Sequence, residues 1–135
     1  MANANEALTG SVEWFDLTVE DTERVRDFYA NVVGWTPRGL SMGDFEDYEM
    51  LVPATGTCVT GICHARGSNA NIPPQWLIYV RVPDVDGSAA RAVALGGEIV
   101  DGPRHMGSGR FCVIRDPAGA VFALFMPEGE TQLLE

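Results

Sequence analysis

The sequence carries the same series of strand, helix and turn signals twice, at an offset of 63 residues, and this repeat constrains the possible folds more than any other feature. Five identical pairs align at this offset without a gap: Val19 with Val82, Asp21 with Asp84, Gly34 with Gly97, Gly39 with Gly102, and Gly56 with Gly119. Tyr48 aligns with the aromatic Phe111. The number of identities alone is near chance, but they fall at strand ends, helix termini and turns, where backbone geometry restricts residue choice. The repeat predicts two structural copies in one chain.

Each copy opens with an alternating apolar run that predicts a strand, at residues 14–19 and 77–82. A helix follows the strand in each copy. In the first copy its N-cap is expected at Asp21 or Thr22, and Gly34 ends it. In the second copy the N-cap is expected at Asp84 or Asp86, and Gly96 and Gly97 end it. Three short strands then complete each copy, at residues 36–39, 46–52 and 57–64, and at residues 98–103, 109–115 and 120–126. The order βαβββ therefore occurs twice.

This order predicts an α+β fold made of tandem βαβββ modules. With 135 residues, of which 46% are hydrophobic, the chain suits one compact domain with a sizeable core. The expected parts are a first module at about residues 10–65, a polar, proline-ended linker at 66–74, a second module at about 75–127 and a C-terminal tail at 128–135.

The charge balance excludes two classes of partner. Lys and Arg number 9 against 19 Asp and Glu, and a formal net charge of -10 repels nucleic-acid backbones and anionic lipid surfaces. Neither nucleic acid nor a membrane is therefore expected.

The start, MANANEALTG, lacks the basic and apolar segments of a signal peptide, so a cytoplasmic protein is expected. Cys58, Cys63 and Cys112 lack the paired spacing of a zinc site, and we expect unreactive thiols in a reducing compartment.

Several pieces of both copies resemble the vicinal oxygen chelate superfamily, which includes glyoxalases and bleomycin-resistance proteins. The pieces are WFDLTVEDTERVRDFYANVVGW, LIYVRVPD, Leu95-Gly96-Gly97, Gly109-Arg110-Phe111 and Asp116-Pro117-Ala118-Gly119, and the resemblance covers residues 12–127. It implies a curved mixed sheet around a cavity for a small molecule. It also implies that modules of one chain can pair with each other or with those of a second chain, so a homodimer is possible.

The resemblance further implies a divalent metal held by four His or Glu side chains from the first and last strands of each module. At the 63-residue offset these positions fall at Trp14, Thr60, Leu77 and Ala123. Only Thr could offer even a weak oxygen, and among the neighbouring residues only Glu13 could coordinate. We therefore expect no cofactor. A displaced metal site formed by Asp16, Glu49, His64 and His105 is the alternative.

Strand alternation predicts which side chains line the cavity. The predicted lining is Trp14, Asp16, Thr18, Cys58, Thr60, Ile62, His64, Leu77, Tyr79, Arg81, Val121, Ala123 and Phe125. Asp16, with Tyr79 or Arg81, is the candidate for proton transfer or polar recognition, and a structural ion pair of Asp16 with Arg81 is the alternative.

Three residues have specific expected contacts with a ligand. Trp14 can stack on a flat molecule, and His64 would lie at the cavity rim. Arg110 follows a glycine-bearing loop at residues 106–110, where it would be available to an anionic group. These residues complete the predicted ligand-binding set.

Three functions are compatible with these features. The first is a metal-free protein that binds a partly aromatic or amphipathic small molecule without transforming it. The second is an enzyme: a lyase, isomerase or dioxygenase that uses Asp16 with Tyr79 or Arg81, or a displaced metal. The third is a partner-binding module whose cavity is filled by its own aromatic side chains. Fold analogy alone does not decide among them.

Overall fold

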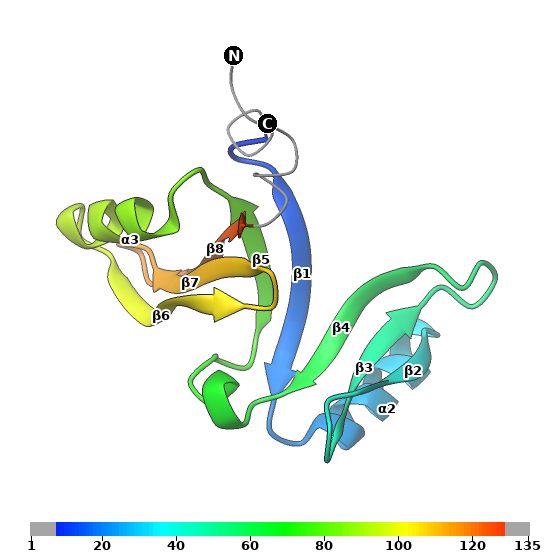
Figure 1. Ribbon diagram of the computed structural model, residues 1–135. Helices are drawn as coiled ribbons and strands as arrows, with labels where there is room; N and C mark the ends of the chain where they lie inside the picture. Colours follow the sequence, from blue (N-terminus) through cyan, green and yellow to red (C-terminus); the bar gives the residue numbers. More distant parts are fainter. Residues whose placement is uncertain (1–7, 129–135) are drawn as a thin grey trace. The chain divides into compact units, whose positions relative to one another are not determined.

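The computed structural model describes residues 8–128, and in this range the chain is an α+β protein with eight strands and two α-helices. The first half contains β1 (Val12–Val19), α2 (Thr22–Val33), β2 (Thr36–Ser41), β3 (Glu46–Leu51) and β4 (Cys58–His64), followed by the short 3-10 helix η1 (Gly67–Asn69). The second half contains β5 (Trp76–Arg81), α3 (Val85–Ala94), β6 (Glu98–Met106), β7 (Gly109–Arg115) and β8 (Val121–Pro127). The predicted βαβββ order is confirmed in both halves (Figure 1). The predicted tail lies outside the described residues, apart from Glu128.

Internal contacts divide the chain into two compact units. Residues 15–76 form one unit, which we call the N-terminal unit. The described residues up to Trp14, together with those from Leu77 onward, form the other, which we call the C-terminal unit. Strand β1 therefore contributes its first residues to one unit and its remaining residues to the other. The predicted linker at 66–74 belongs to the N-terminal unit and contains η1.

The N-terminal unit has the strand order β2-β3-β4-β1, and only the β1–β4 pair among these is parallel. Helix α2 ends, as predicted, at Gly34, which adopts a left-handed conformation with φ 90° and donates its N–H to the Ala30 carbonyl. The buried core consists of Leu17, Val19, Tyr48, Met50 and Ile62, with Val25, Tyr29, Trp35 and Trp76 packed against it. The side chains of α2 and the alternate residues of the strands thus form one hydrophobic cluster.

The C-terminal unit has the strand order β5-β8-β7-β6, with β5 and β8 parallel. Asp84 is the N-cap of helix α3, and its side chain accepts the Gly87 N–H at 3.1 Å. The buried core of the C-terminal unit consists of Val85, Ala89, Cys112, Ile114 and Leu124. A side chain at Gly97 would place its Cβ 2.7 Å from the Arg115 carbonyl oxygen, so glycine permits α3 to end close to the sheet.

The last strand of the N-terminal unit has a different register from the one that the repeat predicts. In the parallel β1–β4 pair Asp16 lies beside Gly61, whereas in the parallel β5–β8 pair Tyr79 lies beside Ala123. Since Asp16 and Tyr79 are related by the repeat, Gly61 corresponds to Ala123. The repeat predicted Thr60 as the counterpart of Ala123, and this prediction is wrong by one residue.

This one-residue shift exchanges the faces of the strand. Ile62 joins the core beneath α2, and Thr60 and His64 alternate with it on the same side. The prediction that Thr60, Ile62 and His64 line the cavity is therefore wrong, and Gly61 and Cys63 lie on the same face as Asp16 instead. Strand β3 shares this change: Tyr48 pairs with Ile62 just as its counterpart Phe111 pairs with Phe125, yet Tyr48 belongs to the core beneath α2, whereas Phe111 lies on the face opposite α3. The offset therefore lies between β1 and the β3–β4 hairpin, which changes face as a unit.

The glycine-bearing segment at residues 106–110 also differs from its prediction as a loop. Strand β6 continues through His105 to Met106, and β7 begins at Gly109, so only residues 107–108 form the turn. Met106 therefore belongs to strand β6.

Within residues 8–128, no helix has the length and apolar character needed to cross a membrane.

Candidate functional site

In the C-terminal unit the sheet has one face covered by α3 and an opposite face, which we call the open face. Strand register places two rows of side chains on it: Asp101, Val113, Ala123 and Tyr79 in one row, and Arg104, Phe111, Phe125 and Arg81 in the next. The alternate residues Cys112 and Leu124 belong to the core beneath α3. The predicted positions of Tyr79, Arg81, Ala123 and Phe125 on the face opposite the helix are confirmed.

A pocket of about 150 Å³ lies within this unit, and we call it the aromatic pocket. It is lined by Glu13, Trp14, Tyr79, Met106 and Phe125. The structure thus brings together three residues of the predicted lining, Trp14, Tyr79 and Phe125. Met106 was not predicted to line the cavity because the glycines around it are typical of a loop, and Glu13 was identified only as a residue able to coordinate a metal.

Glu13 and Arg81 form an ion pair beside the aromatic pocket. Arg81 donates from Nη2 to Oε1 of Glu13 at 2.5 Å, and the Ser11 hydroxyl donates to Oε2 at 2.9 Å. The Arg81 side chain is 5% exposed, whereas the Glu13 side chain is 27% exposed. The carboxylate is therefore the more accessible member of the pair.

A second charged pair lies on the open face, at β6. Arg104 donates from Nε and Nη2 to the two carboxylate oxygens of Asp101, at 3.1 and 2.8 Å. Its guanidinium lies 4.4 Å above the ring centre of Phe111, which in turn lies 6.4 Å from the ring of Tyr79. No sequence signal pointed to this group, because its members are brought together only by the pairing of β6 with β7.

Arg110 does not lie where sequence analysis expected it. It precedes Phe111 in β7 and so lies on the α3 side of the sheet, where it donates to both oxygens of Asp86 at 2.6 and 2.8 Å. These hydrogen bonds lower the pKa of Asp86 and raise that of Arg110. His105, in the same hairpin, contacts Glu128 at 2.7 Å. Arg110 was expected to be available to an anionic group of a ligand, but in the structure it forms an ion pair that links β7 to α3.

In the N-terminal unit the face opposite α2 carries Asp16, Gly61 and Cys63. Asp16 is partly buried there. Burial, together with the neighbouring carboxylates of Asp16 and Asp47, raises the pKa of the Cys63 thiol. Burial also raises the pKa of Cys58, and it raises that of Cys112 to about 11. All three thiols are therefore held in the protonated, weakly nucleophilic form.

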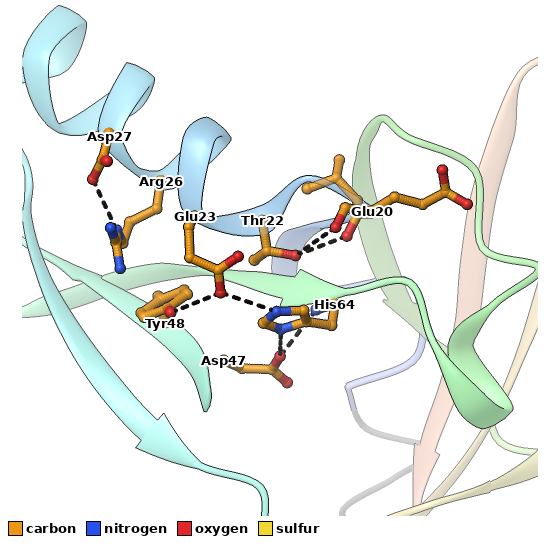
Figure 2. Close-up of polar contacts among 9 residues, drawn as sticks. Glu20, Thr22, Glu23, Arg26, Asp27, Asp47, Tyr48 and His64 are labelled. Carbon is orange, nitrogen blue, oxygen red and sulfur yellow. Dashed lines mark hydrogen bonds and ion pairs between the residues drawn. The ribbon is translucent and has the colours of Figure 1, made fainter. Parts of the chain in front are cut away.

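His64 belongs to a polar network under α2. Its Nδ1 lies 3.0 Å from Oδ1 of Asp47, and its Nε2 lies 3.2 Å from Oε2 of Glu23 (Figure 2). The Tyr48 hydroxyl donates to the same Glu23 oxygen at 3.0 Å, and the Arg26 guanidinium lies 4.7 Å from the Tyr48 ring centre. This network joins the first turn of α2 to β3 and β4, so His64 has a structural setting rather than a place at the cavity rim.

This network gives a pH-dependent prediction for Glu23. A backbone hydrogen bond at Glu23, then the hydrogen bond from Tyr48 and the nearby His64, lower its pKa below the ordinary value of 4.5. Its contribution to stability is therefore fully present above the pKa of the unfolded chain and is lost as the pH falls through the lower folded value. We expect Glu23→Gln to flatten the rise of unfolding free energy between about pH 3 and 5. Urea unfolding at several pH values measures the dependence of the unfolding free energy on pH. An equal pH dependence in Glu23→Gln and wild type would contradict the prediction. Glu20→Gln is the control at an exposed carboxylate.

A second pocket, of about 330 Å³, lies in the N-terminal unit where the linker folds back toward the end of β1. It is lined by Thr18, Val19, Glu20, Ala65, Ala70, Ile72 and Pro74. Its wall consists mainly of small aliphatic side chains. No aromatic side chain lines this pocket among the described residues, so the aromatic pocket is the stronger candidate for ligand recognition.

Comparison with known proteins places this architecture in a family. The sequence model of the Glyoxalase/Bleomycin resistance protein/Dioxygenase superfamily matches residues 11–124. The chain belongs to this superfamily. The crystal structure of methylmalonyl-CoA epimerase from Mycobacterium tuberculosis matches with a TM-score of 0.51 at 18% identity, covering 94% of this chain and 93% of that one. At this identity the likeness shows a shared fold alone.

Curated relatives in the superfamily are longer than this chain. The putative glyoxylase CFP32 of Mycobacterium bovis is 32% identical over 120 residues, which cover 88% of this chain and 45% of the relative. The anthracycline biosynthesis protein DnrV of Streptomyces peucetius is 30% identical over 129 residues, which cover 86% of this chain and 46% of the relative. The chain spans about half the length of the curated relatives it matches.

The residues at the superfamily's metal-ligand positions do not fit a divalent metal. With the register of β4 taken from the structure, these positions carry Trp14, Gly61, Leu77 and Ala123. None of the four side chains offers a lone pair to a metal ion. In the stretch from residue 8 to 128, no group of three or more His, Cys, Asp or Glu side chains is arranged to hold one.

The alternative of a displaced metal site is not supported by the placement of its members. Glu49 pairs with Gly61 and accepts a hydrogen bond from Arg38 at 3.0 Å. His64 lies on the opposite, α2 side of the same strands. Two of the proposed ligands therefore point to opposite faces of one sheet.

Proposed function

We propose that this chain is a metal-free, small-molecule-binding member of its superfamily, whose ligand is partly aromatic or amphipathic. The observation that carries the proposal is the aromatic pocket. Trp14 occupies a position at which the superfamily resemblance implies a metal ligand, and it lines a pocket together with Tyr79 and Phe125. An aromatic surface thus stands where coordination chemistry would otherwise be expected.

The size of the aromatic pocket suggests how a ligand would use it. Complete ligand pockets enclose roughly 300 Å³ or more, so a pocket of about 150 Å³ takes one group of a larger molecule. The remainder of the ligand would lie along the open face, where the partly exposed Arg104–Asp101 pair offers polar contacts. The name of DnrV supports testing an anthracycline aglycone, a neutral molecule with flat fused rings.

We expect Trp14→Ala to weaken binding of the neutral aglycone about tenfold, because stacking on an indole contributes on the order of 1 kcal/mol beyond the area it buries. Isothermal titration calorimetry on the full chain measures the dissociation constant. Phe28→Ala is the matched control, because Phe28 is 56% exposed on α2 and belongs to the other unit. We expect this control to bind as the wild type does.

The same titration tests whether the ligand site needs a metal. We expect EDTA to leave the dissociation constant of the wild type unchanged. A stoichiometric, tightly bound divalent ion in protein purified without a metal-affinity step would contradict the proposal. So would equal affinities of Trp14→Ala and wild type for an aglycone that binds.

A further inference from the structure

We infer that the aromatic pocket is a subsite for a cation, and that the group it takes is the methylated ammonium of an amphipathic ligand. This inference rests on the proposed function, because it specifies which group of the bound molecule enters the pocket. Three features carry it: the aromatic walls, the carboxylate beside them and the small volume.

The walls of the pocket have the composition of sites that bind quaternary ammonium groups. Trp14, Tyr79 and Phe125 contribute three aromatic side chains, and Met106 adds a polarizable thioether. The face of an aromatic ring attracts a cation through its quadrupole, most strongly for tryptophan. A neutral apolar group of equal size gains only the hydrophobic part of this interaction.

The accessible charge beside the pocket is negative. Glu13 lines the pocket, whereas the lining found among the described residues does not include its ion-pair partner Arg81. The Arg81 side chain is almost completely buried, whereas the Glu13 side chain keeps about a quarter of its surface exposed. An incoming cation therefore meets the carboxylate before the guanidinium. The net charge of -10 adds a field that attracts cations.

The volume favours a compact group. About 150 Å³ is less than a complete ligand needs, but it is sufficient for a trimethylammonium group or a single small ring. A tert-butyl group has the same outline as trimethylammonium and no charge. The two groups therefore separate recognition of a cation from recognition of a shape.

The test compares choline with 3,3-dimethyl-1-butanol, its uncharged carbon counterpart, by calorimetric or NMR titration of the full chain. We expect choline to bind about tenfold more tightly, in keeping with a cation–π contribution in a partly desolvated site. Trp14→Ala should remove most of this difference, and Glu13→Gln should reduce it. Phe28→Ala and Glu20→Gln, an aromatic and a carboxylate outside the aromatic pocket, should preserve it. Circular dichroism checks the fold of Glu13→Gln, because Arg81 loses a charged partner in that variant.

The outcomes separate this inference from the proposed function. If the neutral aglycone binds and choline binds no more tightly than its uncharged counterpart, the cation subsite is overturned and the proposed function stands. If choline is preferred equally by wild type and Trp14→Ala, the assignment to the aromatic pocket is overturned. If no probe binds, both proposals fail.

Discussion

Phe111→Ala is expected to lower the free energy of unfolding by about 3–5 kcal/mol, the usual cost of truncating a buried phenylalanine. Phe111 is fully buried on the open face of β7. Its ring supports the Arg104 guanidinium at 4.4 Å and lies 6.4 Å from the Tyr79 ring. The truncation would therefore leave a cavity and also remove the aromatic surface that holds the Arg104–Asp101 pair. Urea unfolding followed by far-ultraviolet circular dichroism measures the change.

Phe28→Ala provides the matched control for this prediction. The same atoms are removed, but Phe28 is 56% exposed on α2, so its truncation should change the stability by no more than about 0.5 kcal/mol. A loss below about 1 kcal/mol in Phe111→Ala would contradict the complete burial of Phe111.

Gly109→Ala is expected to destabilise the protein by about 1–3 kcal/mol and to weaken ligand binding as well. A Cβ at this position would lie 2.5 Å from Cε1 of Phe125 and 2.9 Å from the carbonyl oxygen of Met126. The second contact is with backbone, so rotation of the Phe125 ring alone cannot relieve the crowding. Because Phe125 lines the aromatic pocket, the displacement would reach the ligand site. Urea unfolding and calorimetric titration of one preparation measure both effects.

Gly61→Ala is the control for this substitution. Gly61 also lies within a strand, but the nearest atom to its added Cβ is the Tyr48 carbonyl oxygen at 3.5 Å, an ordinary van der Waals distance. We expect its stability to stay within about 1 kcal/mol of wild type, because the smaller conformational freedom of alanine in the unfolded chain favours folding. Equal stability and ligand affinity in Gly109→Ala and Gly61→Ala would disprove the steric argument.

The helices and the βαβββ order could be predicted because their signals are local in sequence. Asp84 caps the N-terminus of α3, and Gly34 ends α2 in a left-handed conformation that favours glycine. Residues next to each other in the chain determine both features. The same locality explains why Tyr79 and Phe125 could be assigned to the correct face, since each follows the simple alternation of its own strand.

The parts of the candidate site that could not be predicted depend on pairing between distant residues. Glu13 and Arg81 are 68 positions apart, and nothing near either residue indicates the other. Arg110 was expected to face a ligand because its partner Asp86, on another element, could not be identified from sequence. His64 was assigned to the wrong face because β4 pairs with β1, 45 positions earlier in the chain, one residue away from the register that the repeat predicts. Register and ion pairing are set by tertiary structure, which a periodic pattern does not encode.

The one-residue offset of the β3–β4 hairpin against β1 has a consequence for how a duplicated chain diverges. Strands β3 and β4 pair with each other as β7 and β8 do, but β4 pairs with β1 one residue further along than β8 pairs with β5, so the inward and outward residues of β3 and β4 change together. A one-residue slip of a whole hairpin can therefore give one half of a duplicated protein a new set of surface side chains in a single event, where point substitutions would need to change each position separately. In such proteins, the register of a hairpin is an inherited determinant of what the neighbouring surface can recognise.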